Sequence, residues 1–186
     1  TNTSIIDGFT IQSCEGSSEG GGVYCNGSSP IIRNCIFSYN YATSNGGGIC
    51  CRNNGDAEIS NCEFTGNASG YNAGAIQIYN ASPTISNCQF NLSQGDHYGG
   101  VVYAYNSDPL FVTQCEFTGN HAPVGGVFFL TGSNSTITSC IFKDNYVNDS
   151  AGDDPGGVFY ITGGVHSIIN CGFSGNTADE GGAMYL

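Results

Sequence analysis

Cysteine, acidic and aromatic side chains are the groups of this sequence that could do chemistry. The 186-residue chain has 10 cysteines, 15 acidic residues and only 3 basic residues, which are Arg33, Arg52 and Lys143. Glycoside hydrolysis needs two carboxyl groups about 5 to 9 Å apart. Glu58 and Glu63 belong to one repeat, while Glu63 and Glu116 share a repeat position but are two repeats apart. We therefore expect a protein that is not an enzyme, with a polysaccharide lyase or hydrolase as the alternative.

One acidic run lies in segment 143–155 and offers oxygen atoms that Ca²⁺ would accept. Its four candidate ligands are Asp144, Asp149, Asp153 and Asp154. Their spacing matches neither an EF-hand nor a glycine-rich calcium repeat, so a solvated loop is the simpler interpretation. The three histidines do not accompany a cysteine at ligand spacing, and we expect no other cofactor or metal.

The cysteines are placed by an internal repeat. Segments 32–40, 59–67 and 168–176 share the pattern Ile-x-Asn-Cys-x-Phe-x-x-Asn, and looser copies occur between them. The repeat length is about 26 residues. Seven cysteines are assigned to one repeat position: Cys14, Cys35, Cys62, Cys88, Cys115, Cys140 and Cys171.

Each repeat also contains a second block, most often Gly-Gly followed by Val, Ile or Ala, and a turn rich in Asn, Gly, Ser or Pro. Short β-rich runs separated by turn residues predict strands and no helix. One such unit cannot bury its own apolar face, but a stack of units can. We therefore predict a single all-β domain over residues 1–186, a parallel β-helix of about seven coils roughly 34 Å long.

Alternation along the strands predicts which side chains face the core. Cys and Phe of each Cys-x-Phe lie on one face, which gives columns of thiols and phenyl rings inside the stack. The recurrent Asn residues fit turns in which stacked amides bond to one another. We expect mostly free, buried thiols. Cys25 and Cys51 are the candidate disulfide, and Cys50 is expected to point outward.

An outward strip of aromatic residues is the predicted partner or glycan surface. Val101, Val127 and Val158 are expected on the same outer side. The strip comprises Tyr24, Tyr79, Tyr103, Tyr105, Phe129, Tyr160 and Tyr185.

The formal net charge of -12 argues against nucleic acid and anionic lipid as partners. No stretch is long and apolar enough for direct membrane insertion of this segment. Seven Asn-x-Ser/Thr sequons permit N-glycosylation in a suitable secretory pathway. They begin at Asn2, Asn26, Asn67, Asn80, Asn91, Asn134 and Asn148.

The segment 4–11, the Gly-Gly-Val-Tyr-Cys of 21–25 and the repeated Asn-Cys-x-Phe-x-x-Asn together resemble the right-handed parallel β-helix proteins of bacterial surfaces. The Phe-x-x-Asn and Gly-Gly-Ala-Ile motifs are similar to those of polymorphic outer membrane protein passenger domains. The resemblance covers the whole chain and implies the fold of the pectate lyases. It also implies an extracellular or cell-surface location.

These observations favour an extracellular structural or adhesive rod, with self-association, other surface proteins or glycans as partners. Both ends look uncapped, and open strand edges are templates for pairing. The chain is therefore expected either to stack head to tail into a fibre or to be part of a longer chain. The alternative is a carbohydrate-active enzyme or a glycan-binding module on the same fold.

Overall fold

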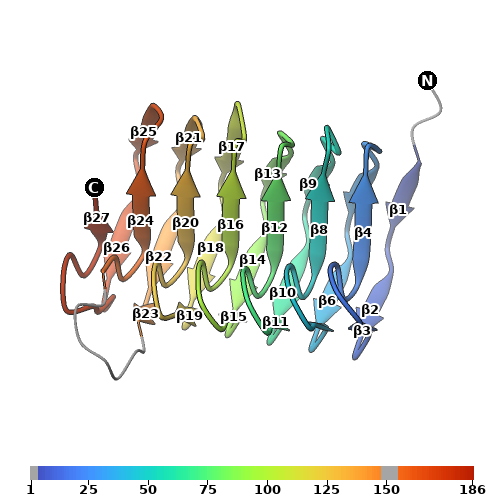
Figure 1. Ribbon diagram of the computed structural model, residues 1–186, viewed down its shortest axis with the longest axis horizontal. Coiled ribbons are helices and arrows are strands. Elements are labelled where there is room, and N and C mark those ends of the chain that lie inside the picture. Colours follow the sequence, from blue (N-terminus) through green and yellow to red (C-terminus); the bar gives the residue numbers. More distant parts are fainter. Residues whose placement is uncertain (1–3, 148–154) are drawn as a thin grey trace.

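The computed structural model describes residues 4–147 and 155–186 as a stack of β-coils, with the two ends of the chain at opposite ends of the stack (Figure 1). All regular secondary structure in the described residues is β-strand, in 27 short segments. These residues contain no helix with the length and hydropathy that crossing a bilayer requires.

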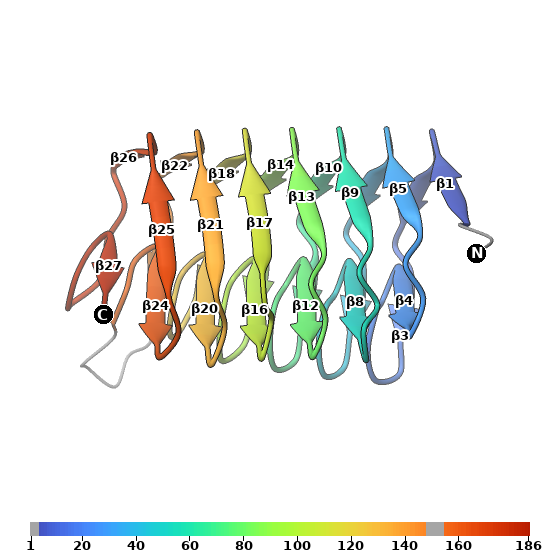
Figure 2. The same ribbon diagram turned by 90° about the horizontal axis from the view of Figure 1, so that it is seen from above.

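The strands form four parallel sheets that run along the stack, of which three have seven strands and one has six. Seen from above, the strands of the first and fourth sheets follow one another coil by coil (Figure 2). The first sheet contains β1 (Ile5–Asp7), β5 (Ile31–Arg33), β9 (Glu58–Ser60), β13 (Thr84–Ser86), β17 (Leu110–Thr113), β21 (Ser135–Thr138) and β25 (His166–Ile169). The second contains β2 (Thr10–Gln12), β6 (Ile36–Ser38), β10 (Glu63–Thr65), β14 (Gln89–Asn91), β18 (Glu116–Thr118), β22 (Ile141–Lys143) and β26 (Gly172–Ser174).

The other two sheets complete each coil. The third contains β3 (Glu15–Gly16), β7 (Tyr41–Ala42), β11 (Ala68–Ser69), β15 (Gln94–Gly95), β19 (His121–Ala122) and β23 (Tyr146–Val147). The fourth contains β4 (Val23–Asn26), β8 (Ile49–Arg52), β12 (Ile76–Tyr79), β16 (Val102–Tyr105), β20 (Phe128–Thr131), β24 (Phe159–Thr162) and β27 (Met184–Tyr185).

Equivalent residues of successive repeats lie directly over one another. Phe64 pairs with Phe37 on one side and with Phe90 on the other, in parallel register. The same correspondence holds in the fourth sheet, where Ile76 pairs with Ile49 and Val102. The predicted all-β solenoid with one coil per repeat is therefore confirmed.

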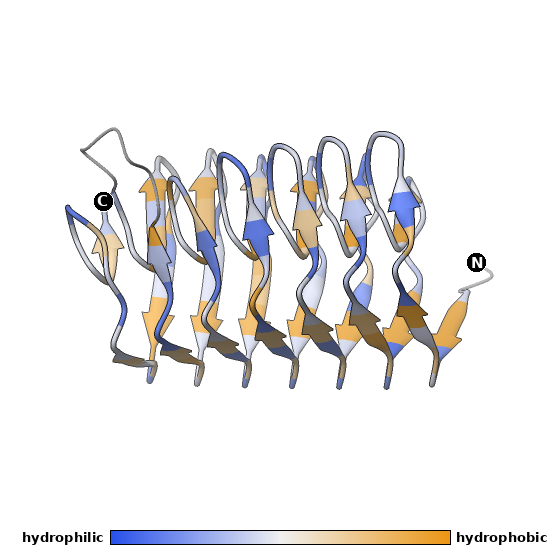
Figure 3. Cartoon of the chain, turned by 90° about the horizontal axis from the view of Figure 1, so that it is seen from below, coloured by the Kyte–Doolittle hydropathy of each residue, from blue (hydrophilic) through white to orange (hydrophobic). Residues whose placement is uncertain are grey.

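A column of phenylalanine rings fills the core behind the second sheet. Neighbouring rings stack with centroids 4.7 to 5.0 Å apart, and the five rings from Phe37 to Phe142 are completely buried. In Figure 3 the apolar colouring lies mainly on the strands, whereas most of the connecting loops are pale or hydrophilic. Burying each such ring contributes about 1.5 to 3 kcal/mol, so this column is a main source of stability.

A ladder of buried asparagines runs beside the rings at the turn between the second and third sheets. The side-chain amide of Asn40 donates to the carbonyl oxygen of Ile11 and to Oδ1 of Asn67, both at 2.9 Å. The backbone N–H of Asn40 also donates to Oδ1 of Asn67, at 3.1 Å. The same bonds join Asn120, Asn145 and Asn176 in the later coils. These amides satisfy backbone groups that the sharp turn removes from the sheets.

Serine interrupts this ladder in the fourth coil. The backbone N–H of Ser93 donates to Oδ1 of Asn120 at 2.9 Å, as an asparagine would. Its hydroxyl is buried without a hydrogen-bond partner. The short side chain therefore leaves the side chains of Asn67 and Asn120 unconnected.

The first coil differs from the prediction for Cys14. Ile6 pairs with Ile32 and Ile11 pairs with Phe37, so the five-residue spacing between inward-facing side chains sets the register. Cys14 consequently occupies the repeat position that Asn40 has in the next coil. Its backbone N–H donates to Oδ1 of Asn40 at 3.0 Å. Its side chain is exposed, so Cys14 is not a member of the buried cysteine column.

The prediction for Val101, Val127 and Val158 was also wrong. All three side chains are completely buried and belong to the core. Each precedes its strand at a glycine-rich bend, where strict alternation does not hold. A Cβ at the equivalent Gly22 would lie 3.3 Å from the ring of Phe37, which shows that this position faces inward.

Replacing Ser93 with Asn should restore the ladder. The new amide would accept hydrogen bonds from Asn67 and would remove the unpartnered hydroxyl, so we expect the free energy of unfolding to rise by about 1 to 2 kcal/mol. Urea denaturation measures this change. The control Ser174→Asn, at an exposed position, should alter stability by less than about 0.5 kcal/mol. Equal effects of the two variants would contradict the ladder's energetic role.

Candidate functional site

Four aromatic residues of the predicted strip lie on the outer side of the fourth sheet in consecutive coils. Tyr103, Phe129, Tyr160 and Tyr185 pair in register along β16, β20, β24 and β27. Their ring centroids are 5.2, 4.9 and 5.2 Å apart, and neighbouring planes differ by 13° or less. The predicted placement of these four residues in one outer column agrees with the structure, and their role as a partner or glycan surface stays a prediction.

A second column lies on the same sheet, two residues further along the strands β8, β12 and β16. Tyr79 and Tyr105 stack at 5.0 Å, and the guanidinium of Arg52 lies 4.6 Å from the centre of the Tyr79 ring. Arg52 also forms an ion pair of 2.8 Å with Glu19, whose side chain is 14% exposed. Cation-π contact and ion pair together hold this end of the column in place.

Tyr24 is separated from the rest of the strip. Cys50 and Gln77 occupy the two intervening positions of its column, and both are buried. Glu19 contributes to the burial of Cys50, because its Oε2 lies 4.0 Å from the Cys50 thiol. Burial, and then the charge of Glu19, raise the pKa of that thiol. Cys50 therefore has the outer strand position that the sequence predicted, but residues packed over it bury its side chain.

Residues of the preceding loops also pack against the strip. The ring centroid of Tyr98 lies 4.6 Å from that of Phe129, and the rings of Tyr71 and His97 pack against each other at a tilt, with centroids 4.4 Å apart. Burial raises the pKa of Tyr103. Because the rings stack on one another, most ring faces are occupied within the molecule. The strip therefore presents ring edges and hydroxyl groups to solvent, a poor platform for a ligand that must stack on a ring face.

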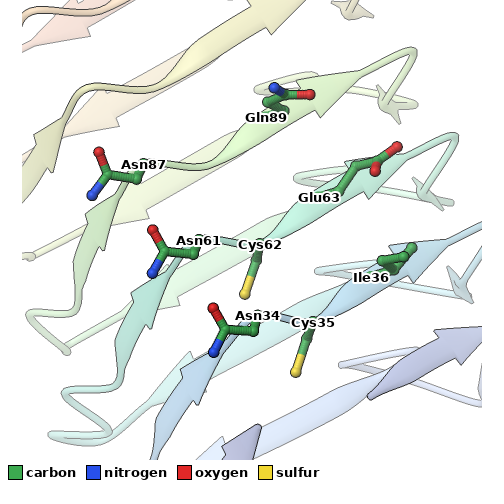
Figure 4. Close-up of a pocket in the computed structure, with 8 residues that line it drawn as sticks. All are labelled: Asn34, Cys35, Ile36, Asn61, Cys62, Glu63, Asn87 and Gln89. Carbon is green, nitrogen blue, oxygen red and sulfur yellow. The ribbon is translucent and has the colours of Figure 1, made fainter. Parts of the chain in front are cut away.

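A polar groove lies at the bend between the first and second sheets and was not predicted. Three asparagines, Asn34, Asn61 and Asn87, form one wall, and their side chains project in a row (Figure 4). Ile36, Glu63 and Gln89 form the other wall, and Cys35 and Cys62 lie between them. The groove has a volume of about 390 Å³.

The backbone of the groove explains the choice of asparagine. Asn34, Asn61 and Asn87 have φ angles of 54, 52 and 52°, in the left-handed region that Asn tolerates better than most residues. Asn34 donates to Oδ1 of Asp7 at 2.8 Å. The Asn that precedes the cysteine in several repeats is the signal from which this row could have been found.

A second groove, of about 480 Å³, lies at the turns between the fourth and first sheets. Asp56 and Asp108 line it, but their carboxylates are used within the fold. Asp56 accepts from the backbone N–H of Ser82 at 2.7 Å, and Asp108 accepts from the amide of Asn134 at 3.0 Å. These acids therefore bridge successive coils.

The calcium prediction is only partly covered by the structure. Asp149, Asp153 and Asp154 lie outside the described residues. Asp144 is exposed at a turn with φ of 53°, and Lys143 lies 3.9 Å from its carboxylate. Among residues 4–147 and 155–186, no three His, Cys, Asp or Glu side chains are grouped to hold a metal ion.

All three basic residues form ion pairs with acids. Arg33 pairs with Asp7 at 2.9 Å, Arg52 with Glu19 and Lys143 with Asp144. The pairs of Arg33 and Arg52 join the same two coils at different sheets, whereas the Lys143 pair lies several coils away. Their charges are thus partly neutralised within the molecule.

Cys25 and Cys51 pair in register in neighbouring coils and are both buried. All ten cysteines are free thiols. The prediction of mostly buried, free thiols is confirmed for the cysteines at the bend between the first and second sheets, whereas the candidate Cys25–Cys51 disulfide is not formed. Stacked positions of parallel strands lie about 4.8 Å apart, wider than the Cβ separation of about 3.8 Å that a disulfide prefers.

The sequons differ in accessibility. Asn26 and Asn80 are exposed, and Asn91 and Asn134 are half-buried, so these four stay candidates. Asn67 conflicts with glycosylation because it is fully buried and its amide donates to the carbonyl oxygen of Phe37 at 2.8 Å. The remaining two, Asn2 and Asn148, lie outside the described residues.

The stacked rings should stabilise the fold. Phe129→Ala removes contacts with Tyr103, Tyr160 and Tyr98, and we expect the free energy of unfolding to fall by about 2 kcal/mol, less than for a fully buried ring. Tyr24→Ala, outside the stack, is the control and should cost less than half as much. Chemical denaturation of both variants measures the difference. An unchanged stability of Phe129→Ala would mean that the stack has no structural role.

The geometry agrees with a comparison against protein families. The family model described as "Right handed beta helix region" matches residues 2–91 and 22–185, and so covers nearly the whole chain. No curated protein and no solved structure matched the chain. The repeat, the four parallel sheets and the family match lead to one conclusion: the chain belongs to the right-handed β-helix family.

Proposed function

We propose that this chain is an extracellular structural or adhesive rod. The observation that carries the proposal is the stacking of equivalent side chains along the axis. Phenyl rings contact their equivalents in the next coil from Phe37 to Phe173, and asparagine amides and outer aromatic rings do so over parts of the stack. Such contacts resist bending and separation of coils, which is what a rigid spacer requires.

The surface composition supports the extracellular part of the proposal. Charged residues make up 10% of the chain, and the net charge is -12, which suits neither nucleic acid nor anionic membrane. Similarity of the repeats to polymorphic outer membrane protein passenger domains supports the same location. Nine of the ten thiols are not exposed, and burial would protect them from oxidation there.

Self-association is the partner that we favour. The end coils leave core side chains partly exposed, among them Ile6 and Val23 at one end and Phe173 and Met184 at the other. A second copy, or further coils of a longer chain, would bury them equally well. In either case the surface covered would be the open end of the stack.

Electron microscopy of the native material tests this proposal. We expect rods or fibres whose long axis follows the stack of coils. Incubation of the same material with neutral and acidic polysaccharides should release no new sugar ends. Compact, isolated particles that cleave a polysaccharide would overturn the proposal and favour the enzyme alternative.

Glycan binding is a second candidate, and the polar groove is the observation that favours it. Its row of asparagine amides repeats once per coil, and Glu63 and Gln89 face it. Amides and carboxylates can bond to sugar hydroxyls, and the acidic surface would favour a neutral or amino-bearing chain over an anionic one.

The double variant Asn61→Gly and Asn87→Gly tests glycan binding. Glycine keeps the left-handed turn and removes only the amide, so we expect at least tenfold weaker binding to any glycan that the native chain retains on an array. Asn170→Gly, at the same turn position outside the groove, is the matched control. Equal binding by the three proteins would exclude the groove as the glycan site.

A further inference from the structure

Six cysteines form an unbroken file inside the rod, a feature that neither structural nor glycan-binding roles use. They lie at the bend between the first and second sheets in six successive coils. The file comprises Cys35, Cys62, Cys88, Cys115, Cys140 and Cys171. The first five are at most 3% exposed and the last is half-buried. In Figure 4 the sulfur atoms of Cys35 and Cys62 point in the same direction.

Backbone contacts hold the sulfur atoms in this arrangement. Each thiol lies 3.1 to 3.4 Å from the carbonyl oxygen two residues earlier. It also lies 3.6 to 4.0 Å from a carbonyl oxygen of the preceding coil. Oriented thiols therefore repeat with the period of the coil.

Neighbouring thiols are close enough to affect one another. The backbone N–H of Cys88 donates to the sulfur of Cys115 at 3.5 Å. Contacts with the thiols of Cys115 and then Cys62 lower the pKa of Cys88. The file is thus a continuous row of sulfur ligands rather than six separate side chains.

The spacing of the row favours a bridging atom over a direct bond. Stacked positions lie about 4.8 Å apart, whereas the sulfur atoms of a disulfide lie about 2.05 Å apart. A metal–thiolate bond is about 2.3 Å long, as for zinc, so two such bonds in line span about 4.6 Å. An ion between two stacked thiols would therefore require little movement of the backbone.

The surroundings select the kind of ion. The described residues contain no group of three side chains that could complete a tetrahedral or octahedral site. On its inner side the file borders the apolar core, with the phenylalanine column two residues away, and on its outer side Cys35 and Cys62 lie at the base of the polar groove. Thiolates without oxygen or nitrogen ligands select soft ions, and only an ion that is satisfied by two ligands fits a stacked pair.

We propose that the cysteine file binds soft, two-coordinate metal ions, each held between the sulfur atoms of two neighbouring coils. Binding breaks two S–H bonds, forms two metal–sulfur bonds and releases two protons to solvent, with no change of oxidation state. A divalent ion such as Hg(II) gives a neutral complex, which suits an apolar core. Cu(I) in the same position leaves one negative charge. Six stacked thiols hold three such ions, and half-buried Cys171 provides an entry point.

Two variants with equal numbers of thiols test the bridging. Both are made in a chain whose other four cysteines, Cys14, Cys25, Cys50 and Cys51, are replaced by Ala. Substitution of Cys88 and Cys115 with Ala leaves two pairs of thiols in neighbouring coils, Cys35 with Cys62 and Cys140 with Cys171. Removing Cys62 and Cys115 in the same way also leaves four thiols, but only Cys140 and Cys171 are neighbours.

Native mass spectrometry after reduction and exposure to mercuric chloride counts the bound ions. We expect three ions with the complete file, two in the first variant and one in the second. Cu(I) should follow the same order, and zinc should not bind. Equal numbers of ions in the two variants, or one ion per thiol, would overturn the proposal.

A measurement on the unsubstituted chain covers the case in which these variants fail to fold. Mercury L-edge X-ray absorption of the protein loaded with three equivalents should report two sulfur ligands per ion. The melting temperature should rise on loading, because a stacked pair exists only in the folded coil. One sulfur ligand per ion, or an unchanged melting temperature, would contradict the proposal.

Discussion

The parallel pairing of each coil with the next is the constraint on which the rest of the structure depends. Because the strands pair in register, a side chain at one repeat position must contact the same position of its neighbours. Side chains that tolerate like neighbours, such as phenyl rings, amides and thiols, are therefore favoured. Unlike the core of a globular protein, this core is a set of columns, and in each column the side chains have to pack against their own equivalents.

The asparagine ladder shows how the constraint works at a turn. A sharp change of direction takes backbone groups out of the sheets, and a buried amide can serve both its own coil and the next. The same logic appears on the surface, where Asp56, Ser82 and Asp108 join successive turns. Much of the polar chemistry of this chain is thus used between coils, which leaves the exposed amide row and the inner thiol file as the repeated groups with capacity for a ligand.

The repeat predicted the fold and most inward columns because period and alternation are local properties of the sequence. It failed where geometry depends on more than one coil. Cys14 was misplaced because the spacing of Ile6 and Ile11, not the cysteine, sets the register of the first coil. Val101 was misplaced because alternation is lost at a glycine bend. The cover over Cys50 comes from a loop of the preceding coil, which alternation along one strand cannot reveal.

For the candidate surfaces too, the sequence of one strand predicts residue positions, whereas contacts between coils decide how the side chains are arranged. Positions of the aromatic strip could be predicted, but ring stacking and the interruption at Cys50 and Gln77 arise only from contacts between coils. The amide row was missed because its asparagines were interpreted only as part of a repeat motif. In the structure they stand in the left-handed region with their side chains outward.

Nuclear magnetic resonance of the asparagine side chains tests the stacking of coils most directly. If equivalent residues lie over one another, the side-chain amide protons of Asn40 and Asn145 should give cross-peaks with Asn67 and Asn176, respectively, and should exchange slowly with solvent. Rapid exchange and an absence of these cross-peaks in the folded protein would contradict the account.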